Sequence, residues 1–476
     1  MTSLLPNYTP TPTQPTTFYL GTGTSIYSSL LPQLLSTNHQ LIIVTCFWAS
    51  SSSQQDIHQL LLRLSRRATA EQRTIHIRIC FSSLSPLQKI FDTASTDGHL
   101  YAPSRYASLG LPSETEIPGL DVRIKSIFFR PCHVLHGKYI IQDERRVWFP
   151  SCNVSWEAWG EGCIGFEGGG GLVSDLKGYW SRIWDGDGTM GIPEIIGTTR
   201  MAERSREGPM EMGDRDASLL ASIDLSHLPA DTETLLLPHT HSRYNPFSVI
   251  FHPNAKTPIT PLNTFLLSHI STAKSSIKIY TPNLTYKPII NALFEALSRG
   301  VHVRIVASRN LMRLEQLVTA GTLTEWEVWK MRRRYRRLAS PPPTSTSRRV
   351  DDLEASTASA ARVGNLDIFY FRPPPAHVHG DDANHDNANA TANANPNDNA
   401  NARTEGILTT SRRNINAESR PVKLHLKMTI IDDAIAVLGS GNMDRASWVT
   451  SQELGVAIFS EDVSRSLGAV ARRVYG

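Results

Sequence analysis

Short apolar runs alternate with amphipathic stretches along this chain, and the same alternation occurs twice. In the first half, a strand-type run, a helical pattern and a second strand-type run follow one another at residues 41–45, 57–67 and 75–80. The same order returns in the second half at residues 277–280, 287–299 and 301–307. Each set predicts a β-α-β unit with parallel strands, so we expect an α/β fold that contains mixed sheets.

The repeat extends beyond these units and locates an insertion. A Leu-Asp pair followed by an aromatic-Arg-Pro sequence occurs in both halves, and each half ends in a helical pattern, at residues 172–186 and 462–476. Arg130 precedes His136 by 6 residues, whereas its counterpart Arg372 precedes His425 by 53. The second half therefore has 47 additional residues in one loop, where extra length costs little closure entropy.

Composition separates two ordered halves from several flexible segments. We predict a flexible amino terminus, a first half, a linker and a second half at residues 1–20, 21–190, 191–230 and 231–476. Two insertions in the second half, at about residues 339–362 and 374–420, are predicted to be flexible. Residues 381–402 contain eight Asn and seven Ala but no large apolar side chain, so they cannot bury enough surface to offset their ordering entropy.

Charge and cysteine content exclude several classes of protein. The 48 basic and 44 acidic side chains give a formal net charge of +4, which suits an anionic substrate but disfavours a nucleic-acid partner. The five cysteines lack the spacing of a zinc site or a disulfide framework. The amino terminus lacks a secretory signal pattern, and the longest apolar run, residues 41–49, is too short to cross a bilayer. We therefore expect a cytoplasmic protein.

A helical pattern at residues 311–338 ends in a basic cluster. Five of the six residues from Arg332 to Arg337 are arginines. The helix macrodipole favours cations at a helix carboxy terminus, so the cluster fits a solvated helix end. The same charges also fit a docking site for anionic lipid headgroups, or a nuclear-import or nucleic-acid contact. The sequence leaves these interpretations open.

One polar motif occurs in both halves at the same spacing. The first copy comprises His136, Lys138, Asp143, Ser151 and Asn153. The second copy comprises His425, Lys427, Asp432, Ser440 and Asn442. The His-to-Asn separation is 17 residues in both copies, and five residue types at five matched offsets are too specific to arise by chance.

Each copy has the pattern of a hairpin, with a polar turn between two strands. A turn centred between residues 144 and 145 would place His136 opposite Asn153 and Lys138 opposite Ser151, with the equivalent register in the second copy. One half would then present an imidazole, an ammonium, an amide and a hydroxyl on one patch. Two halves facing each other across a pseudo-twofold axis would present two of each group.

This set of groups fits displacement at a phosphodiester. Two ammonium groups and the amide donors can stabilise charge that develops on the non-bridging oxygens. One neutral imidazole can attack phosphorus to form a phosphohistidine, while the other protonates the departing alkoxide and then activates water. Because Lys138 and Lys427 supply positive charge, the sequence predicts neither a metal nor another cofactor.

The doubled pattern resembles the phospholipase D superfamily in its two-motif form. The second copy matches the family pattern from His425 through Gly439 to Ser447, and the first departs at Pro150, where the family has Gly. The resemblance covers residues 21–476. It implies duplicated phospholipase D-type α-β-α halves packed around a pseudo-twofold active site.

The resemblance also implies the roles of single residues. In the family, an acidic residue downstream of each Asn orients the histidine. Alignment of Trp156 with Trp448 gives Glu161 and Glu453 for these acids, with Glu157 as an alternative in the first half. The family favours the amino-terminal histidine as nucleophile, so we predict that His136 attacks and His425 is the general acid. The remaining catalytic and substrate-binding positions are the Lys, Asp and Asn residues of both motifs and the serines Ser151 and Ser440.

These implications define a function and its alternatives. The leading hypothesis is a phospholipase D-type phosphodiesterase that acts on phospholipid headgroups through a phosphohistidine. The alternatives are a phosphatidyltransferase similar to cardiolipin or phosphatidylserine synthases, then a nuclease, then an inactive lipid-binding scaffold. We expect a phospholipid substrate, peripheral contact with an anionic membrane surface, and a monomer, because both motifs are in one chain.

Overall fold

The computed structural model describes residues 9–83, 98–129, 133–168, 170–185, 219–240, 257–340, 363–373 and 420–476. The predicted flexible insertions lie almost entirely outside the described residues, as does the larger part of the predicted linker.

The first half is built on a mixed sheet with the spatial order β5-β3-β2-β8-β9-β10-β1. Its strands are β1 (Thr11–Gly21), β2 (Gln40–Phe47), β3 (Ile75–Ser83), β5 (Leu120–Ser126), β8 (Tyr139–Gln142), β9 (Arg146–Pro150) and β10 (Trp159–Glu167). Strands β2, β3 and β5 are parallel, as the β-α-β pattern predicts, and the remaining pairs of this series are antiparallel. The short strand β4 (His99–Leu100) pairs with β5.

The second half repeats this order in the series β15-β14-β13-β17-β18-β19-β12. Its strands are β12 (Thr232–His239), β13 (Ser276–Thr281), β14 (His302–Ala307), β15 (Leu366–Tyr370), β17 (Met428–Ile431), β18 (Ile435–Gly439) and β19 (Glu453–Phe459). Strands β13, β14 and β15 are parallel, and the others pair antiparallel. The α/β fold class with duplicated halves and mixed sheets is therefore confirmed.

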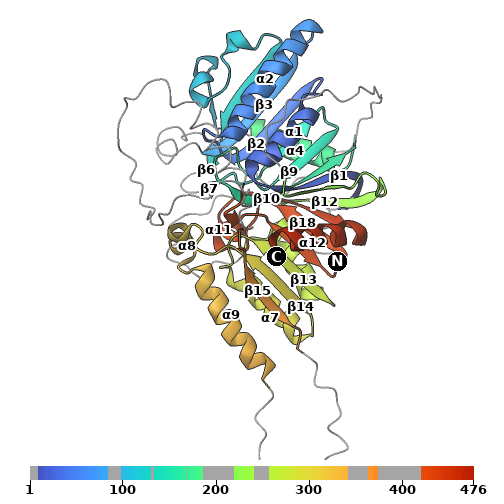
Figure 1. Ribbon diagram of the computed structural model, residues 1–476, viewed down its shortest axis with the longest axis vertical. Helices are drawn as coiled ribbons and strands as arrows, with labels where there is room; N and C mark the ends of the chain where they lie inside the picture. Colours follow the sequence, from blue (N-terminus) through green and yellow to red (C-terminus); the bar gives the residue numbers. More distant parts are fainter. Residues whose placement is uncertain are drawn as a thin grey trace, which may run out of the picture.

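The two sheets join through their equivalent strands. Strand β1 pairs with β12 of the second half, where Pro12 lies opposite Glu233, and it also pairs with β11 (Ala221–Asp224). A second junction is formed by β10 and the short parallel strand β16 (Lys423–Leu424). In Figure 1 the first half, in blue and green, meets the second half, in yellow and red, near β10, β12 and β18.

Helices cover the sheets in layers. The first half has α1 (Gly23–Leu34), α2 (Ser52–Ala70) and α4 (Leu172–Asp185), and the second has α6 (Pro261–Thr272), α7 (Lys287–Ser298) and α12 (Glu461–Tyr475). Helices α1 and α2 pack in an outer apolar cluster of the first half, and α6 and α7 in that of the second. A central cluster unites both sheets with α4 and α12, so the halves share one core layer. Each described helix is too short or too polar to cross a membrane.

The predicted flexible amino terminus is partly wrong. Residues Thr11 to Leu20 belong to β1, and Phe18 and Leu20 are fully buried. The Pro- and Thr-rich composition is compatible with a strand here because the register shifts between Pro15 and Thr17, where an irregular ladder tolerates a residue without an amide donor. Part of the predicted linker is likewise ordered, because β11 extends the sheet beside β1.

The helix predicted at residues 311–338 is two helices. These are α8 (Arg313–Ala320) and α9 (Thr324–Ala339). Gly321 has a φ of 64°, in the left-handed region that ends a helix and that glycine adopts without strain.

Candidate active site

Both copies of the polar motif lie at the ends of hairpins that meet between the halves. The hairpins are β8–β9 and β17–β18, and their turns place Asp143 and Asp432 in the left-handed region, with φ of 52° and 54°. The predicted register is wrong by one residue, since Ile140 pairs with Trp148 and Met428 with Leu438. The turn contains three residues and is centred on a residue, not between two, so the motif residues flank the ladder without forming direct cross-strand pairs.

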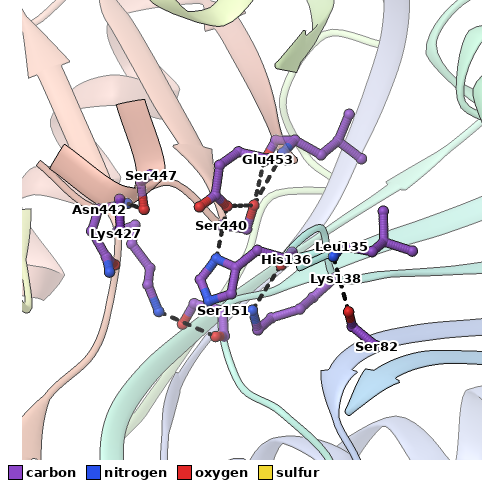
Figure 2. A network of polar contacts seen from close by, with 12 residues as sticks. Ser82, Leu135, His136, Lys138, Ser151, Lys427, Ser440, Asn442, Ser447 and Glu453 are labelled. Carbon is purple, nitrogen blue, oxygen red and sulfur yellow. Dashed lines mark hydrogen bonds and ion pairs between the residues drawn. The ribbon is translucent and has the colours of Figure 1, made fainter. Parts of the chain in front are cut away.

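The first histidine is held by a carboxylate from the second half. Nδ1 of His136 lies 2.7 Å from Oε2 of Glu453, whose side chain is fully buried. The hydroxyl of Ser440 donates to the same oxygen at 2.5 Å, and the Leu454 amide donates to that hydroxyl at 3.0 Å (Figure 2). With Nδ1 bound to the carboxylate, Nε2 of the neutral imidazole has the lone pair.

The second histidine has the equivalent arrangement in the repeated half. Nδ1 of His425 lies 2.6 Å from Oε1 of Glu161. The Ser151 hydroxyl donates a short hydrogen bond to Oε2, the other oxygen of the same carboxylate. The Gly162 amide donates to the Ser151 hydroxyl at 3.0 Å. Of the two acids considered for the first half, Glu161 and Glu157, Glu161 makes this contact.

The acids therefore cross between the halves. His136 belongs to the first half and Glu453 to the second, while His425 belongs to the second and Glu161 to the first. Backbone bonds cross at the same points, since the His136 amide donates to the Gln452 carbonyl at 2.8 Å and the His425 amide to the Gly160 carbonyl at 2.7 Å. Neither half contains a complete His–Glu pair. Sequence alignment identified both acids, but it has no signal for which histidine each one contacts.

Two buried lysines supply positive charge beside the imidazoles. Nζ of Lys427 lies 2.7 Å and 2.9 Å from the two ring nitrogens of His425, and Nζ of Lys138 donates to the His136 carbonyl at 2.8 Å. In Figure 2 both lysine side chains extend toward the His136 ring from opposite sides. Burial lowers the pKa of Lys427 to about 7, although Glu161 opposes that shift.

Burial and charge also keep the imidazoles neutral. Burial is the main cause that lowers the pKa of His136, and it lowers the pKa of His425 to about 3. The glutamates oppose these shifts, whereas the positive charges of Lys138 and Lys427 lower the pKa of both histidines further. Because each lysine influences both rings, the two motifs form one electrostatic unit.

The two glutamates stay ionised inside this unit. Burial raises the pKa of a carboxyl group, but at Glu161 the neighbouring His425 and Lys427 and the hydrogen bond from Ser151 outweigh burial and lower the pKa to about 2. The pKa of Glu453 is lowered in the same sense by His136, Lys138 and Ser440. Ionised carboxylates at Nδ1 fix the tautomer in which Nε2 is unprotonated.

Ser151 and Ser440 have a different place from the predicted substrate contact. Both hydroxyls donate to a glutamate and are almost fully buried, with 3% and 1% exposure. Pro150 precedes Ser151 at the end of β9 and pairs with Cys163, so the departure from the family pattern leaves this contact in place. We therefore expect both serines to position the carboxylates, and their contact with substrate stays a prediction.

The two asparagines are placed unequally. Asn442 lines a pocket together with Lys427, Thr281 and Trp448, and its Nδ2 donates to Asp444 at 3.0 Å. The side-chain oxygen of Asn153 accepts a hydrogen bond from the Phe47 amide at 3.2 Å, at the end of β2. Asn442 thus lies beside a motif lysine, whereas the Asn153 side chain accepts a hydrogen bond from a backbone amide.

Trp159 is a residue of the site that sequence reasoning missed. Its ring centroid lies 4.6 Å from that of His425, and the His425 side chain is 6% exposed against 17% for His136. Trp159 begins β10 and pairs with Lys423, two residues before His425. A tryptophan outside the repeated motif gave no signal, because the contact depends on the junction between β10 and β16.

The motif aspartates do not join the cluster. The Asp143 carboxylate accepts hydrogen bonds of 2.7–2.9 Å from the amides of residues 38–40, which lead into β2. Asp432 accepts bonds of 2.7–3.1 Å from the amides of residues 274–276, which lead into β13. These amide donors lower the pKa of Asp432 although burial opposes them. The carboxylate of each aspartate therefore hydrogen-bonds its hairpin turn to the start of the neighbouring strand.

Asp143→Ala and Asp432→Ala are therefore expected to reduce stability more than catalysis. Each substitution removes the acceptor of several backbone amides and should lower the free energy of unfolding by about 1–2 kcal/mol. Thermal and denaturant unfolding would measure this loss, and kcat of the folded variants should stay within a few fold of wild type. Glu144→Ala, at the exposed neighbour in the same turn, is the control. A large fall in kcat with unchanged stability would contradict this assignment.

Comparison with known proteins agrees with the geometry. The family described as "Cardiolipin synthase, PLD-like domain" matches residues 266–474. The second half of the chain therefore contains a phospholipase D-like domain. The match is to an enzyme family of the phosphatidyltransferase and phosphodiesterase type, so the chain is classed with enzymes. None of the curated proteins matches the chain significantly.

One solved structure shares the fold over most of this chain at low sequence identity. Phosphatidylserine synthase from Haemophilus influenzae is 11% identical, with a TM-score of 0.53, over 97% of this chain and 87% of that chain. NucT from Helicobacter pylori is 14% identical, with a TM-score of 0.24, over 51% of this chain and 94% of that chain. Nuc from Salmonella typhimurium, a phospholipase D family member, is 15% identical, with a TM-score of 0.20, over 45% and 86%. The likeness to phosphatidylserine synthase concerns the fold alone.

Proposed function

We propose that the protein cleaves the phosphodiester between a phosphatidyl group and its headgroup alcohol, through a phosphohistidine. The observation that carries the proposal is the pair of His–Glu contacts that cross between the halves, at 2.7 Å and 2.6 Å, beside two buried lysines. This arrangement provides two neutral imidazoles with fixed tautomers and positive charge for the non-bridging oxygens.

In the first step, Nε2 of His136 attacks phosphorus and forms the P–N bond. His425 takes up a proton at Nε2 from solvent when the anionic substrate binds, and the departing alkoxide takes this proton as the P–O bond to the headgroup breaks. His136 suits the nucleophile role because its ring is the more exposed of the two and Lys138 contacts its backbone carbonyl, not its ring. His425 suits proton transfer, because an anionic phosphate beside Lys427 would offset the charge that lowers the imidazole pKa.

In the second step, neutral His425 accepts a proton from water or from an alcohol. The resulting oxygen nucleophile attacks phosphorus, the P–N bond breaks, and His136 returns to its neutral form. Water yields phosphatidic acid, and an alcohol yields a new phospholipid. Lys427 and Asn442 line a small pocket that has both polar and apolar walls, such as Thr281 and Leu438.

Phosphatidyl transfer is the second candidate function. The family whose description is "Cardiolipin synthase, PLD-like domain" matches the second half, and that description favours an alcohol as the acceptor. Transfer and hydrolysis share both chemical steps and differ only in the group that attacks the phosphohistidine. The same residues therefore serve both reactions.

Product analysis separates these functions. The protein is incubated with mixed phospholipids, with and without glycerol-type alcohols, and separately with oligonucleotides, and the products are identified by mass spectrometry. Phosphatidic acid with free headgroup would support hydrolysis, and an exchanged headgroup would support transfer. Cleaved oligonucleotide with intact lipid would overturn the phospholipid proposal in favour of a nuclease. The His136→Ala/His425→Ala double variant is the control for contaminating activity.

Turnover is expected to be independent of added divalent metal. Lys138 and Lys427 are 2% and 3% exposed and supply the positive charge that a metal would otherwise bring to the phosphate. Turnover in EDTA should match turnover in buffer alone. Loss of activity in EDTA that magnesium restores would contradict the proposed role of the lysines.

The pH dependence of kcat/KM is expected to reflect the ionisation of Lys427. Its charged form is the one that binds phosphate, and its pKa in the free protein is lowered to about 7. Therefore kcat/KM should fall as the pH rises through about 7, where the ammonium loses its proton. A bound phosphate anion raises the lysine pKa, so the corresponding fall in kcat should lie at higher pH. A kcat/KM that stays constant up to pH 9 would contradict this assignment.

A further inference from the structure

Helix α8 presents its apolar residues to solvent. Leu314, Leu317 and Val318 lie at helical spacing on one face and are 76%, 49% and 74% exposed. Met312, just before the helix, is 45% exposed. A surface helix normally places such a stripe toward the core, so this helix has the opposite polarity. Clustered exposed apolar side chains mark an interaction surface.

A polar residue anchors the inner side of the same helix. Gln316 is 3% exposed. Its Nε2 donates to Asn283 at 3.0 Å and to the Leu311 carbonyl at 2.6 Å, and its Oε1 accepts from the Thr324 amide and hydroxyl, both at 2.8 Å. These bonds fix the orientation of α8. The hydrogen bonds of Gln316 therefore hold the apolar stripe of α8 toward solvent.

Helix α9 continues this surface with aromatic and basic side chains. Trp326 and Trp329 are 53% and 47% exposed, and their rings stack at 4.9 Å. Lys330 lies over the Trp326 ring and Arg333 over the Trp329 ring, at 5.7 Å and 5.6 Å. Exposed tryptophans beside cations are typical of residues that sit at the interface between water and a bilayer.

The arginines of α9 divide into two groups. Arg332 donates to the Ile368 carbonyl of β15 at 3.0 Å, and Arg334 lies 4.1 Å from the Phe294 ring of α7. These two arginines hold α9 against the rest of the second half. All five arginines of α9 are exposed, and Arg333, Arg336 and Arg337 form the second group. Three exposed arginines thus add positive charge to a surface that also exposes two tryptophans, whereas Lys330 is paired with Glu327 at 2.8 Å.

We propose that α8 and α9 form a docking surface for an anionic phospholipid bilayer. The apolar stripe of α8 and the Trp326–Trp329 pair would enter the interfacial region, and the exposed arginines of α9 would contact the phosphate groups. The occupant is inferred from charge complementarity together with interfacial tryptophans and aliphatic residues. This inference rests on the proposed phospholipid function. In Figure 1 both helices lie on one flank of the second half.

Hydrogen bonds connect this surface to the candidate active site. Gln316 of α8 bonds to Asn283, and Asn283 donates to Asp444 at 3.4 Å. Asp444 in turn accepts from Asn442, which lies beside Lys427 in the pocket. Arg445, at the start of α11 (Arg445–Val449), donates to the Thr319 carbonyl of α8 at 3.0 Å. A bilayer bound by α8 would thus be fixed relative to the motif of the second half.

Vesicle sedimentation with the full chain tests the proposal. Wild-type protein should bind vesicles of phosphatidylcholine with phosphatidylglycerol at least tenfold more tightly than phosphatidylcholine alone. Leu314→Gln/Val318→Gln and Trp326→Gln/Trp329→Gln should each lose at least tenfold in binding to the anionic vesicles. Arg333→Gln/Arg337→Gln should lose the preference for phosphatidylglycerol.

Matched controls alter exposed residues outside this surface. Leu100→Gln/Ile259→Gln changes two apolar side chains that are 56% and 85% exposed, and Arg63→Gln/Arg66→Gln removes two exposed charges from α2. Both controls should bind vesicles like wild type. Equal losses in the controls and in the α8 and α9 variants would overturn the proposal, because they would show a non-specific effect of polarity or charge.

Activity on two substrates separates this proposal from the proposed function. With a short-chain phospholipid below its critical micelle concentration, the α8 and α9 variants should turn over like wild type, but on anionic vesicles they should be at least tenfold slower. Vesicle binding without turnover of either substrate would refute the phospholipid function and leave docking intact. Turnover of the soluble substrate without vesicle binding would refute docking alone. Concentration-dependent dimerisation that Leu314→Gln/Val318→Gln abolishes would assign the surface to a second copy and overturn the proposal.

Discussion

Acid quench of the His425→Ala variant is expected to trap a phosphohistidine, whereas the His136→Ala variant should trap none. The substrate is a phosphodiester with an activated leaving group and a label on phosphorus. Such a leaving group departs with little protonation, so loss of the general acid should spare the first chemical step. Loss of the nucleophile should remove that step altogether.

The structure gives a reason for this asymmetry between two similar histidines. Both have Nδ1 bound by a buried carboxylate, and both are neutral at pH 7 because burial lowers their pKa. They differ at the remaining nitrogen. Nε2 of His425 lies 2.9 Å from Nζ of Lys427, and its ring packs against Trp159. His136 is the more exposed ring and therefore the better placed to reach phosphorus.

The outcome of the trapping experiment is decisive for the assignment. A labelled His136→Ala variant together with an unlabelled His425→Ala variant would reverse the two roles. His227→Ala, which removes an exposed histidine outside the site, should trap label like wild type. With an unactivated phospholipid, both active-site variants should lose turnover by on the order of 10⁴-fold or more, because that reaction needs the nucleophile and the acid.

The sequence predicted the parts of the fold that depend on local pattern. The β-α-β order and the internal repeat were visible because apolar runs and helical periodicity are local, and β2, β3, β13 and β14 all occur where these patterns predicted strands. The two copies of the motif were visible because their spacing is fixed within a hairpin. Whether their residues are catalytic remains a prediction for the experiments above.

Features that depend on contacts between distant segments could not be read from the sequence. The one-residue register error arose because the left-handed conformation of Asp143 and Asp432 sets the turn length, and their carboxylates were bound by amides over a hundred residues away. The order in β1 was missed because its partners, β10 and β12, are remote in sequence. The contacts of Ser151 and Ser440 with the glutamates were missed for the same reason, since these glutamates lie on other strands.

Glu453→Gln is expected to behave as a defect of His136, although Glu453 belongs to the opposite half of the chain. The variant should lower kcat by on the order of 10²–10⁴-fold, because a neutral amide neither fixes the imidazole tautomer nor stabilises the imidazolium. It should also slow formation of the phosphohistidine with the activated substrate. In the crossed geometry, Glu453 contacts the proposed nucleophile at 2.7 Å.

Glu161→Gln is expected to show the complementary defect. Glu161 contacts His425, the proposed general acid, at 2.6 Å, so turnover of an unactivated phospholipid should fall by a similar factor. Formation of the phosphohistidine with the activated substrate should remain close to the wild-type rate. Ser151→Ala and Ser440→Ala should reproduce the two patterns more weakly, since each serine acts through its glutamate.

The pattern of these four variants distinguishes crossed from within-half pairing. If each acid served the histidine of its own half, Glu161→Gln would block phosphohistidine formation and Glu453→Gln would spare it. A double-mutant cycle adds an independent measure, because His136→Ala with Glu453→Gln should be no slower than His136→Ala alone, whereas residues of separate steps would show additive losses. Since each His–Glu pair takes one member from each half, the cycle would show that chemistry requires both halves of the chain.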